Sequence, residues 1–221
     1  MSNDLRLRRK AMIQELVSLG IMDQKVLEAM ERVKRHRFVD EALQAQAYTN
    51  NALPIGFGQT ISNPYTVALF TSLLQLEPGL KVLEVGTGSG YQAAVMAEIG
   101  AEVFTIERVK NLYLCALKRL NALRYFAISL KYGDGSLGWP KESPFERIIV
   151  TAGSPKVPAP LLENLSEAGV LLAPVYNGSG DSQRLVRIRK DKGTFFSKDL
   201  GPVNFVRLIG RHAWQVDELE R

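Results

Sequence analysis

The sequence predicts an α/β protein built on a doubly wound, mostly parallel β-sheet. Strand-like and helix-like segments alternate from Lys81 onward, which is the pattern of consecutive βαβ units. The segments around Val82, Ile106 and Ile149 are almost wholly apolar, as strands are when helices cover both faces of a sheet. A chain of 221 residues is long enough to bury a substantial core in one domain.

Composition excludes several classes of protein. The chain has 28 Lys and Arg against 23 Asp and Glu, a formal net charge of +5, and interleaved charges favour an ordinary solvated surface. No apolar run reaches the ~18 residues of a membrane-spanning helix, and no apolar stretch follows the charged start of the chain. We therefore expect neither a membrane segment nor a secretory signal. Cys115 is the only cysteine, and His36 and His212 are the only histidines, so we expect no metal site and a cytoplasmic protein.

The N-terminal part is predicted to form helices followed by a loop. An apolar stripe over residues 5–19 predicts a helix that Gly20 can end. A second stripe over residues 26–33 predicts another helix, with Asp23 as its N-cap. Residues 50–63 contain two glycines and a proline and are predicted to be a loop.

The remaining elements follow from caps, apolar runs and turns. Asn63 and Pro64 are typical of the N-cap and first residue of a helix. Helices are also expected at 90–99 and 108–122. Residues 191–193 form a turn sequence that joins the last two strands as an antiparallel pair. The expected strands are 81–86, 102–107, 127–132, 146–152, 168–175, 183–190 and 203–209.

The strongest single signal is a glycine-rich turn after the first apolar strand. Gly86 permits the tight turn, and Gly88 and Gly90 leave the backbone open to a ligand. Glu107 follows roughly 20 residues after Gly86, at the end of the next strand, where a carboxylate can bind both hydroxyls of a ribose. The alternatives are a glycine-rich loop without a ligand and a carboxylate that only starts a helix. Together the two features predict a nucleoside-binding site.

The glycine spacing argues against a dinucleotide cofactor. That fingerprint requires a third glycine where this chain has Tyr91. The observed Gly-x-Gly-x-Gly, preceded by Glu84, instead resembles the S-adenosylmethionine site of the Rossmann-like methyltransferases. In that superfamily an acid after the third strand often lies near the adenine amino group, and Asp134 occupies this position. The alternative for Asp134 is an ordinary turn residue.

Further segments carry a narrower resemblance. They are Gly20–Asp23, Val26–Met30, Arg35–Val39, Ala47-Tyr48, Ala52–Gly56, Gly58–Ser62, Phe145–Ala152, Val157-Pro158 and Gln183–Leu185. Over about residues 6–210 the sequence resembles the bacterial protein-L-isoaspartate O-methyltransferases, and Gly58–Ser62 is the most specific segment.

The resemblance implies methyl transfer from S-adenosylmethionine to the α-carboxylate of L-isoaspartyl residues in damaged proteins and peptides. The methyl ester then collapses to a succinimide, which initiates repair. S-adenosylhomocysteine is the implied product, and no metal is involved. The implied catalytic residue is Ser62. The implied cofactor-binding residues are Gln59, Thr60, Ile61, Ser62, Glu84, Gly86, Thr87, Gly88, Ser89, Gly90, Glu107, Arg108, Asp134, Gly135 and Thr151. The implied substrate-binding residues are Thr60, Ser62, Val206, Arg207 and Leu208.

The chemistry asked of Ser62 is modest. A carboxylate is ionised at neutral pH, so the acceptor needs no general base, and a hydroxyl can hold one of its oxygens in line for attack. The alternative for Ser62 is a helix-capping hydroxyl, although Asn63 already supplies a cap. Arg207 departs from the family, which commonly has proline there, and this concerns the substrate side of the site.

We expect residues 1–221 to form one methyltransferase domain. In this division, 1–62 are a helical N-terminal extension with the active-site loop, and 63–221 are the Rossmann-like core. We expect isoaspartyl proteins and peptides as partners, no nucleic acid, no membrane and a monomer. Two alternatives remain at this stage. One is a methyltransferase of the same fold acting on a nucleic acid or small molecule, and the other is a catalytically silent cofactor-binding module.

Overall fold

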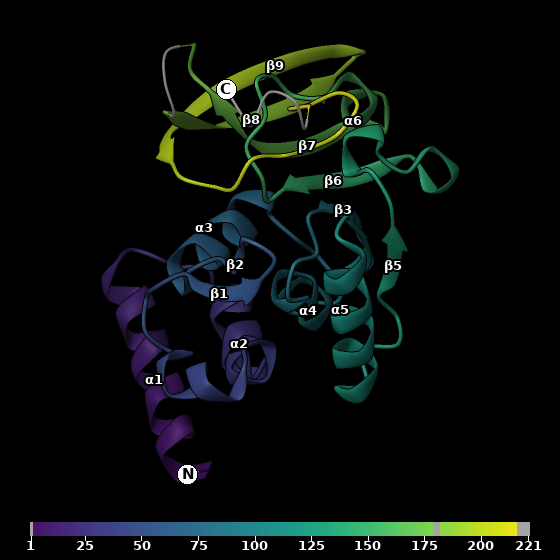
Figure 1. Cartoon of the computed structure of the whole chain (residues 1–221). Coiled ribbons are helices and arrows are strands. Elements are labelled where there is room, and N and C mark those ends of the chain that lie inside the picture. Colours follow the sequence, from purple (N-terminus) through teal and green to yellow (C-terminus); the bar gives the residue numbers. More distant parts are fainter. Residues whose placement is uncertain (1, 179–181, 216–221) are drawn as a thin grey trace.

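A seven-stranded sheet organises the fold, with β7, β8 and β9 at one end of the molecule and the N-terminal helices at the other (Figure 1). The computed structural model describes residues 2–178 and 182–215. The order of the strands across the sheet is β5-β4-β3-β6-β7-β8-β9. Their bounds are β3 Lys81–Val85, β4 Glu102–Glu107, β5 Ser129–Tyr132, β6 Phe145–Val150, β7 Leu165–Tyr176, β8 Gln183–Asp191 and β9 Thr194–Val203.

Strands β3, β4, β5, β6 and β7 are parallel to one another, which confirms the predicted fold class. Val82 of β3 pairs with Val103 of β4 on one side and Arg147 of β6 on the other. Strand β8 runs antiparallel to β7, and β9 runs antiparallel to β8. Because β3, β4 and β6 are parallel, the loops that follow them meet at one edge of the sheet, where open α/β sheets bind their ligands.

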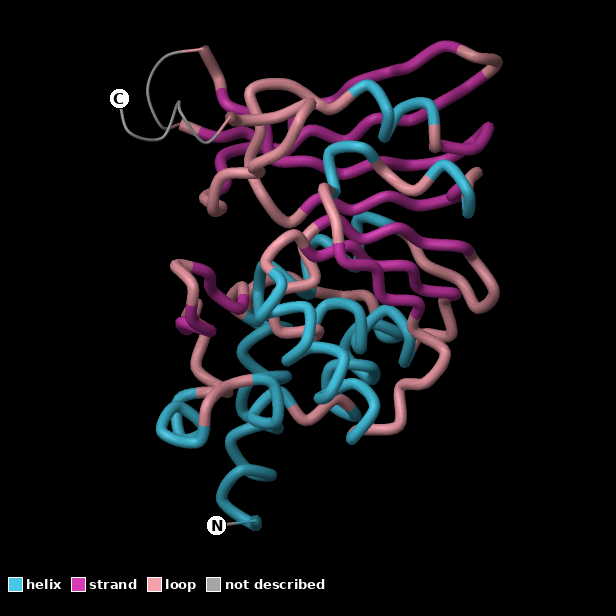
Figure 2. Tube along the Cα trace, turned by 45° about the vertical axis from the view of Figure 1, so that its right-hand side comes forward, coloured by secondary structure: helices cyan, strands magenta, loops and turns pink. Residues whose placement is uncertain are grey.

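Helices pack on the sheet and against one another. Their bounds are α1 Ser2–Ser18, α2 Gln24–Arg32, α3 Pro64–Leu74, α4 Tyr91–Glu98, α5 Lys110–Ala122 and α6 Ala159–Glu163. Short 3-10 helices are η1 Arg35–Phe38, η2 Glu41–Gln46, η3 Gly135–Leu137 and η4 Pro140–Glu142. In Figure 2 the helices α1 and α2 lie below the strands, on the side of the molecule that holds the N-terminus. Within the described ranges, no helix has the length and apolar character needed to cross a bilayer.

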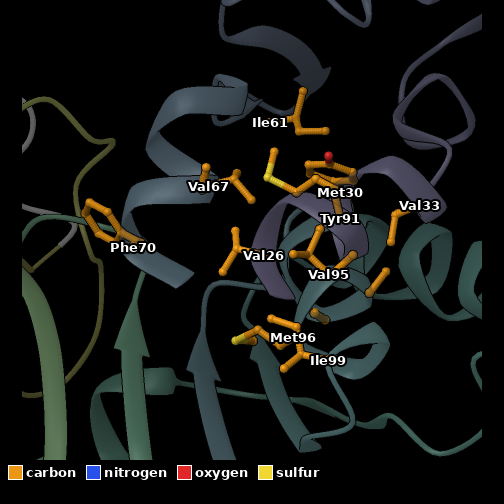
Figure 3. Packing of buried hydrophobic residues seen from close by; sticks show 14 of the residues in the cluster. Val26, Met30, Val33, Ile61, Val67, Phe70, Tyr91, Val95, Met96 and Ile99 are labelled. Carbon is orange, nitrogen blue, oxygen red and sulfur yellow. The ribbon is translucent and has the colours of Figure 1, made fainter. Parts of the chain in front are cut away.

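The N-terminal helices share a hydrophobic cluster with the rest of the fold. Figure 3 shows Val26 and Met30 of α2 close to Val67 of α3 and to Tyr91 and Val95 of α4. All five side chains are almost completely buried. Burying a large apolar side chain stabilises a fold by about 1.5–3 kcal/mol, so this contact fixes α2 firmly against α4.

Two predicted helix caps are confirmed. The Asp23 carboxylate accepts a hydrogen bond of 3.3 Å from the Val26 amide at the start of α2. The Asn63 side chain accepts one of 2.7 Å from the Thr66 amide, and Pro64 is the first residue of α3.

Two predictions of local structure are wrong. Residues 50–63 are not only loop, because Leu53–Gly56 (β1) pairs with Gln59–Ile61 (β2) in a short antiparallel hairpin. The second strand of the C-terminal hairpin is 194–203, rather than 203–209. Strand β9 was missed because most of its residues are exposed and lack the expected alternation. The stretch 203–209 is apolar because part of it lines the cleft described below.

Candidate active site

A cleft lies at the carboxyl edge of the parallel strands. It comprises two adjoining pockets of about 460 and 640 Å³, each including some space open to solvent. Both pockets are lined by Thr60, Gly86, Gly88 and Thr151. We call them the first pocket, which also reaches Glu84 and Ser62, and the second pocket, which reaches Glu107.

The glycine-rich turn gives the cleft a floor of bare backbone. Gly86, Gly88 and Gly90 all have positive φ, at 102°, 52° and 88°, a region that favours glycine. A Cβ on Gly86 would lie 2.3 Å from Oγ1 of Thr151, so no larger residue fits there. The Thr151 hydroxyl lies 2.8 Å from the carbonyl oxygen of Gly86 and can donate to it, which fixes the turn against the end of β6.

Glu107 is built into this floor. Its carboxylate accepts hydrogen bonds of 2.8 Å from the amides of Gly88 and Val109, one at each oxygen. The side chain is buried and faces the second pocket. A carboxylate has about four acceptor sites, so two protein donors leave capacity for a pair of ligand hydroxyls.

Glu84 is a buried acid with an unused oxygen. Its Oε2 accepts a 2.6 Å hydrogen bond from the Thr105 hydroxyl, which in turn lies 2.7 Å from the Thr87 hydroxyl. Its Oε1 has no hydrogen-bond partner within the described part of the chain. Burial is the main reason that the pKa of Glu84 is raised to about 8; the Thr105 hydrogen bond lowers the pKa, and the nearby Glu107 carboxylate adds a smaller rise. An orphaned acceptor beside the first pocket fits a ligand that brings an ammonium group.

Ser62 lies where the first pocket meets a third. This third pocket, about 800 Å³ including open space, is also lined by Asn63, Asn204 and Val206. The Ser62 hydroxyl makes no hydrogen bond to any residue that the structure describes, and Asn63 caps α3, so the capping alternative for Ser62 is excluded. Thr60 lines all three pockets and therefore marks their junction.

The far wall of the cleft is the segment 205–209, which follows β9. The Val206 carbonyl accepts a 2.7 Å hydrogen bond from the Gly153 amide, and the Leu208 amide donates one of 2.7 Å back to the Gly153 carbonyl. The Gln183 side chain adds a second clamp, since its amide nitrogen donates to the Phe205 carbonyl and its oxygen accepts from the Phe205 amide. Gln183 is a positioning residue: the sequence placed it in a segment of the family resemblance but gave it no role, because its partner Phe205 is brought near only by the fold.

Arg207 lines the second pocket together with Leu208. Its guanidinium lies over the ring of Trp214, 5.1 Å from the centroid. The Arg207 side chain is therefore held at the rim of the cleft by a residue further along the chain.

Two predicted cofactor residues lie outside the lining of the cleft, namely Gly90 and Asp134. Asp134 Oδ1 accepts hydrogen bonds from the amide and hydroxyl of Ser136, and its Oδ2 accepts one of 2.7 Å from the Arg211 amide. A Cβ on Gly210 would lie 2.1 Å from Asp134 Oδ1. Asp134 thus fastens the segment after the cleft wall to the loop after β5, and its contact with adenine stays a prediction.

The other predicted cofactor residues line one or both pockets. Those of the first pocket are Thr60, Ile61, Ser62, Glu84, Gly86, Thr87, Gly88, Ser89 and Thr151. Those of the second pocket include Gln59, Glu107, Arg108 and Gly135. The first pocket is also lined by Phe70, Gln92 and Phe205, which the sequence did not single out. Across residues 2–178 and 182–215, no group of three or more His, Cys, Asp or Glu is arranged to hold a metal.

Solved structures define the class of this molecule. One solved protein-L-isoaspartate O-methyltransferase matches it with a TM-score of 0.86 at 25% identity, over 93% of this chain and 67% of that one. A Plasmodium falciparum β-aspartate methyltransferase in complex with S-adenosyl-L-homocysteine matches with a TM-score of 0.80 at 28% identity, over 91% of this chain and 98% of that one. The fold and the cleft are those of a Rossmann-like S-adenosylmethionine-dependent methyltransferase.

Sequence comparison defines the family. A family model described as protein-L-isoaspartate(D-aspartate) O-methyltransferase matches residues 7–213. The chain is 49% identical to protein-L-isoaspartate O-methyltransferase 2 of Geotalea uraniireducens, over 96% of this chain and 97% of that protein. It is 49% identical to protein-L-isoaspartate O-methyltransferase 1 of Syntrophobacter fumaroxidans, over 97% of this chain and 100% of that protein. The chain belongs to the protein-L-isoaspartate(D-aspartate) O-methyltransferase family.

Proposed function

We propose that this chain methylates the α-carboxylate of L-isoaspartyl residues in damaged proteins and peptides, with S-adenosylmethionine as the donor. The observation that carries the proposal is the junction at Thr60, where two pockets suited to a nucleoside and an amino acid meet a third that opens beside Ser62. The methyl ester then closes to a succinimide without the enzyme, and hydrolysis returns part of it to normal aspartate.

The residues of the cleft fit this donor. Glu107 offers its remaining lone pairs to ribose hydroxyls, and Glu84 offers its unpartnered oxygen to the amino group of the methionine part. The bare backbone at Gly86 and Gly88 allows close approach of the ligand to the turn. When bound, the donor supplies an electrophilic methyl group on a positively charged sulfur.

The acceptor side needs positioning more than acid–base help. A carboxylate is ionised at neutral pH, and the Ser62 hydroxyl can donate to one of its oxygens and leave the other free to attack. The attacking oxygen bonds to the methyl carbon as the carbon–sulfur bond breaks and its electron pair stays on sulfur, so no proton moves. A partly desolvated cleft strengthens the attraction between the negative acceptor and the positive donor.

The test is methyl transfer to a matched pair of peptides, one isoaspartyl and one aspartyl. Base-labile label on the isoaspartyl peptide alone is expected, because a carboxyl methyl ester hydrolyses in base. Label on neither peptide, together with demonstrated binding of the cofactor, would direct attention to a nucleic acid or a small molecule as the acceptor.

We also propose that the enzyme works as a monomer in the cytoplasm, on isoaspartyl proteins and peptides, and that it binds neither nucleic acid nor membranes. Its single cysteine, Cys115, suits a reducing compartment. Light scattering after gel filtration tests the oligomeric state, and a mass of two chains would contradict it.

A further inference from the structure

A second cavity lies away from the cleft, between α1 and η1. It measures about 1340 Å³ including space open to solvent, and it shares no lining residue with the three pockets of the active site. Figure 1 shows α1 at the end of the molecule away from β7, β8 and β9. We call this cavity the basic pocket, and its polar lining is Arg6, Arg9, Lys34, His36, Arg37 and Tyr48.

The lining carries four cations and no carboxylate. Two neighbouring cations outside the pocket are paired, since Arg8 contacts Asp4 at 3.0 Å and Arg32 contacts Glu98 at 3.1 Å. Across the residues that the structure describes, none of the four cations of the pocket forms an ion pair. Glu28 and Glu31 do not line this pocket; they line a separate one, to which Arg9 and Lys34 also contribute.

Two groups of the lining, the Arg9 guanidinium and the His36 ring, bear on the binding of an anion. The Nε of Arg9 is buried and has no hydrogen-bond partner among the described residues. His36 Nδ1 lies 2.7 Å from the Tyr48 hydroxyl, so the ring is fixed at the edge of the cavity. The pKa of His36 is lowered by burial first and then by the charges of Arg37, Arg9 and Lys34. The lowering by these three cations indicates a positive potential at the His36 ring.

We propose that the basic pocket binds a phosphate-rich anion. Three guanidinium groups offer planar pairs of donors that match phosphate oxygens, and Lys34 adds a compact charge. Four cations around one cavity match a ligand with several negative charges better than they match a single carboxylate. This binding is separate from methyl transfer, because the two sites share no residue.

The two histidines of the chain give a direct test. With sodium tripolyphosphate as the probe, the ring resonances of His36 are expected to shift in a saturable way and its pKa to rise, because a bound anion offsets the neighbouring cations. His212 lies outside the pocket and serves as the internal reference. Absence of a saturable shift at His36 would overturn the proposal.

Variants establish where the anion binds. Arg9→Gln/Arg37→Gln is expected to weaken tripolyphosphate binding at least about tenfold, because each charge-assisted contact contributes roughly that factor. The matched control Lys10→Gln/Lys118→Gln removes the same charge from exposed positions outside the pocket and is expected to change binding by about twofold or less. Equal weakening by both pairs would mean that only the net charge matters, and would overturn the site.

Two further controls keep the result clear. Both variants are expected to retain methyl transfer and the unfolding profile of the parent. If Arg9→Gln/Arg37→Gln does not fold, Arg6→Gln/Arg37→Gln changes only exposed residues of the same pocket and is expected to weaken binding likewise. A hexaglutamate peptide that binds this site more tightly than tripolyphosphate would overturn the assignment to phosphate.

Discussion

At the scale of single residues, Ser62 is the sharpest test of the acceptor side. Ser62→Ala is expected to lower kcat by about 10- to 100-fold, because one hydrogen-bond donor to the reacting carboxylate is lost. The affinity for S-adenosylhomocysteine, measured by calorimetry, is expected to change by less than about twofold.

Ser197→Ala is the control for this change, because Ser197 is an exposed residue of β9. An equal loss of turnover and of cofactor affinity in Ser62→Ala would assign Ser62 to the cofactor site instead.

The buried Glu84 side chain makes the stability of the fold depend on pH. Its pKa of about 8 lies above the ordinary value of 4.5, so between these values the folded chain holds a proton that the unfolded chain has released. The stability that this proton provides is complete below the lower pKa and is lost as pH rises through the upper one. Glu84→Gln has no group that titrates at this position and so has no such loss. Between about pH 5 and about pH 8.5 the free energy of unfolding of the parent should therefore fall relative to that of Glu84→Gln by roughly 1–4 kcal/mol.

Denaturant unfolding without cofactor measures this difference. Glu102→Gln, an exposed change at the start of the neighbouring strand, is expected to show no such trend. Parallel pH profiles for Glu84→Gln and the parent would contradict the raised pKa.

The sequence could indicate residues such as Gly86 and Glu107 because their role depends on local chain geometry. The glycines stand in one turn, and Glu107 ends the adjacent strand of a parallel pair. It could not indicate that Glu107 also binds the Gly88 amide, or that Glu84 keeps an unpartnered oxygen. Those facts depend on which donors tertiary packing brings near a carboxylate.

At the scale of elements, Asp134 connects the loop after β5 to the segment that follows the cleft wall. Asp134→Ala removes three hydrogen bonds and is expected to lower the free energy of unfolding by about 1–3 kcal/mol. Cofactor affinity should fall as well, because Leu208 and Ile209 of the second pocket lie just before this attachment.

Unfolding and cofactor titration of the same variant separate these effects. Asp40→Ala is the matched control, since the Asp40 side chain makes no capping hydrogen bond at η2. If stability falls while affinity is unchanged, the attachment does not support the pocket.

Most helices and strands could be predicted because their apolar residues recur with the correct period. Strand β4 was predicted at its observed bounds, and Asn63 and Pro64 located the start of α3. The β1–β2 hairpin was not predicted, because its strands are short and Gly56, Phe57 and Gly58 all have positive φ. Pairing of short strands is decided by the contacts of the whole fold and leaves little periodic signal.

At the scale of the whole molecule, the cofactor cleft draws on distant parts of the chain. The hairpin near Thr60, the turn at Gly86 and the wall at Leu208 all contribute to it. S-adenosylhomocysteine at about 100 times its Kd should therefore stabilise the entire fold by about 2.7 kcal/mol, which raises Tm by roughly 5–10 °C.

Calorimetry should show this as one transition that moves as a whole. One transition is expected because residues of α2, α3, α4 and the sheet belong to a common hydrophobic cluster. Two transitions, of which only one responds to the ligand, would contradict our proposal that residues 1–221 form one domain.

The position of the cleft wall late in the chain has a consequence for folding on the ribosome. Residues 205–209 follow every strand of the sheet, whereas the glycine turn and Glu107 precede β5. A nascent chain on the ribosome therefore has the floor of the cofactor cleft long before it has the wall, and protein segments emerge and begin to fold in chain order. We therefore expect a nascent chain to bind S-adenosylmethionine only after residues 205–209 have emerged and packed against the loop that follows β6.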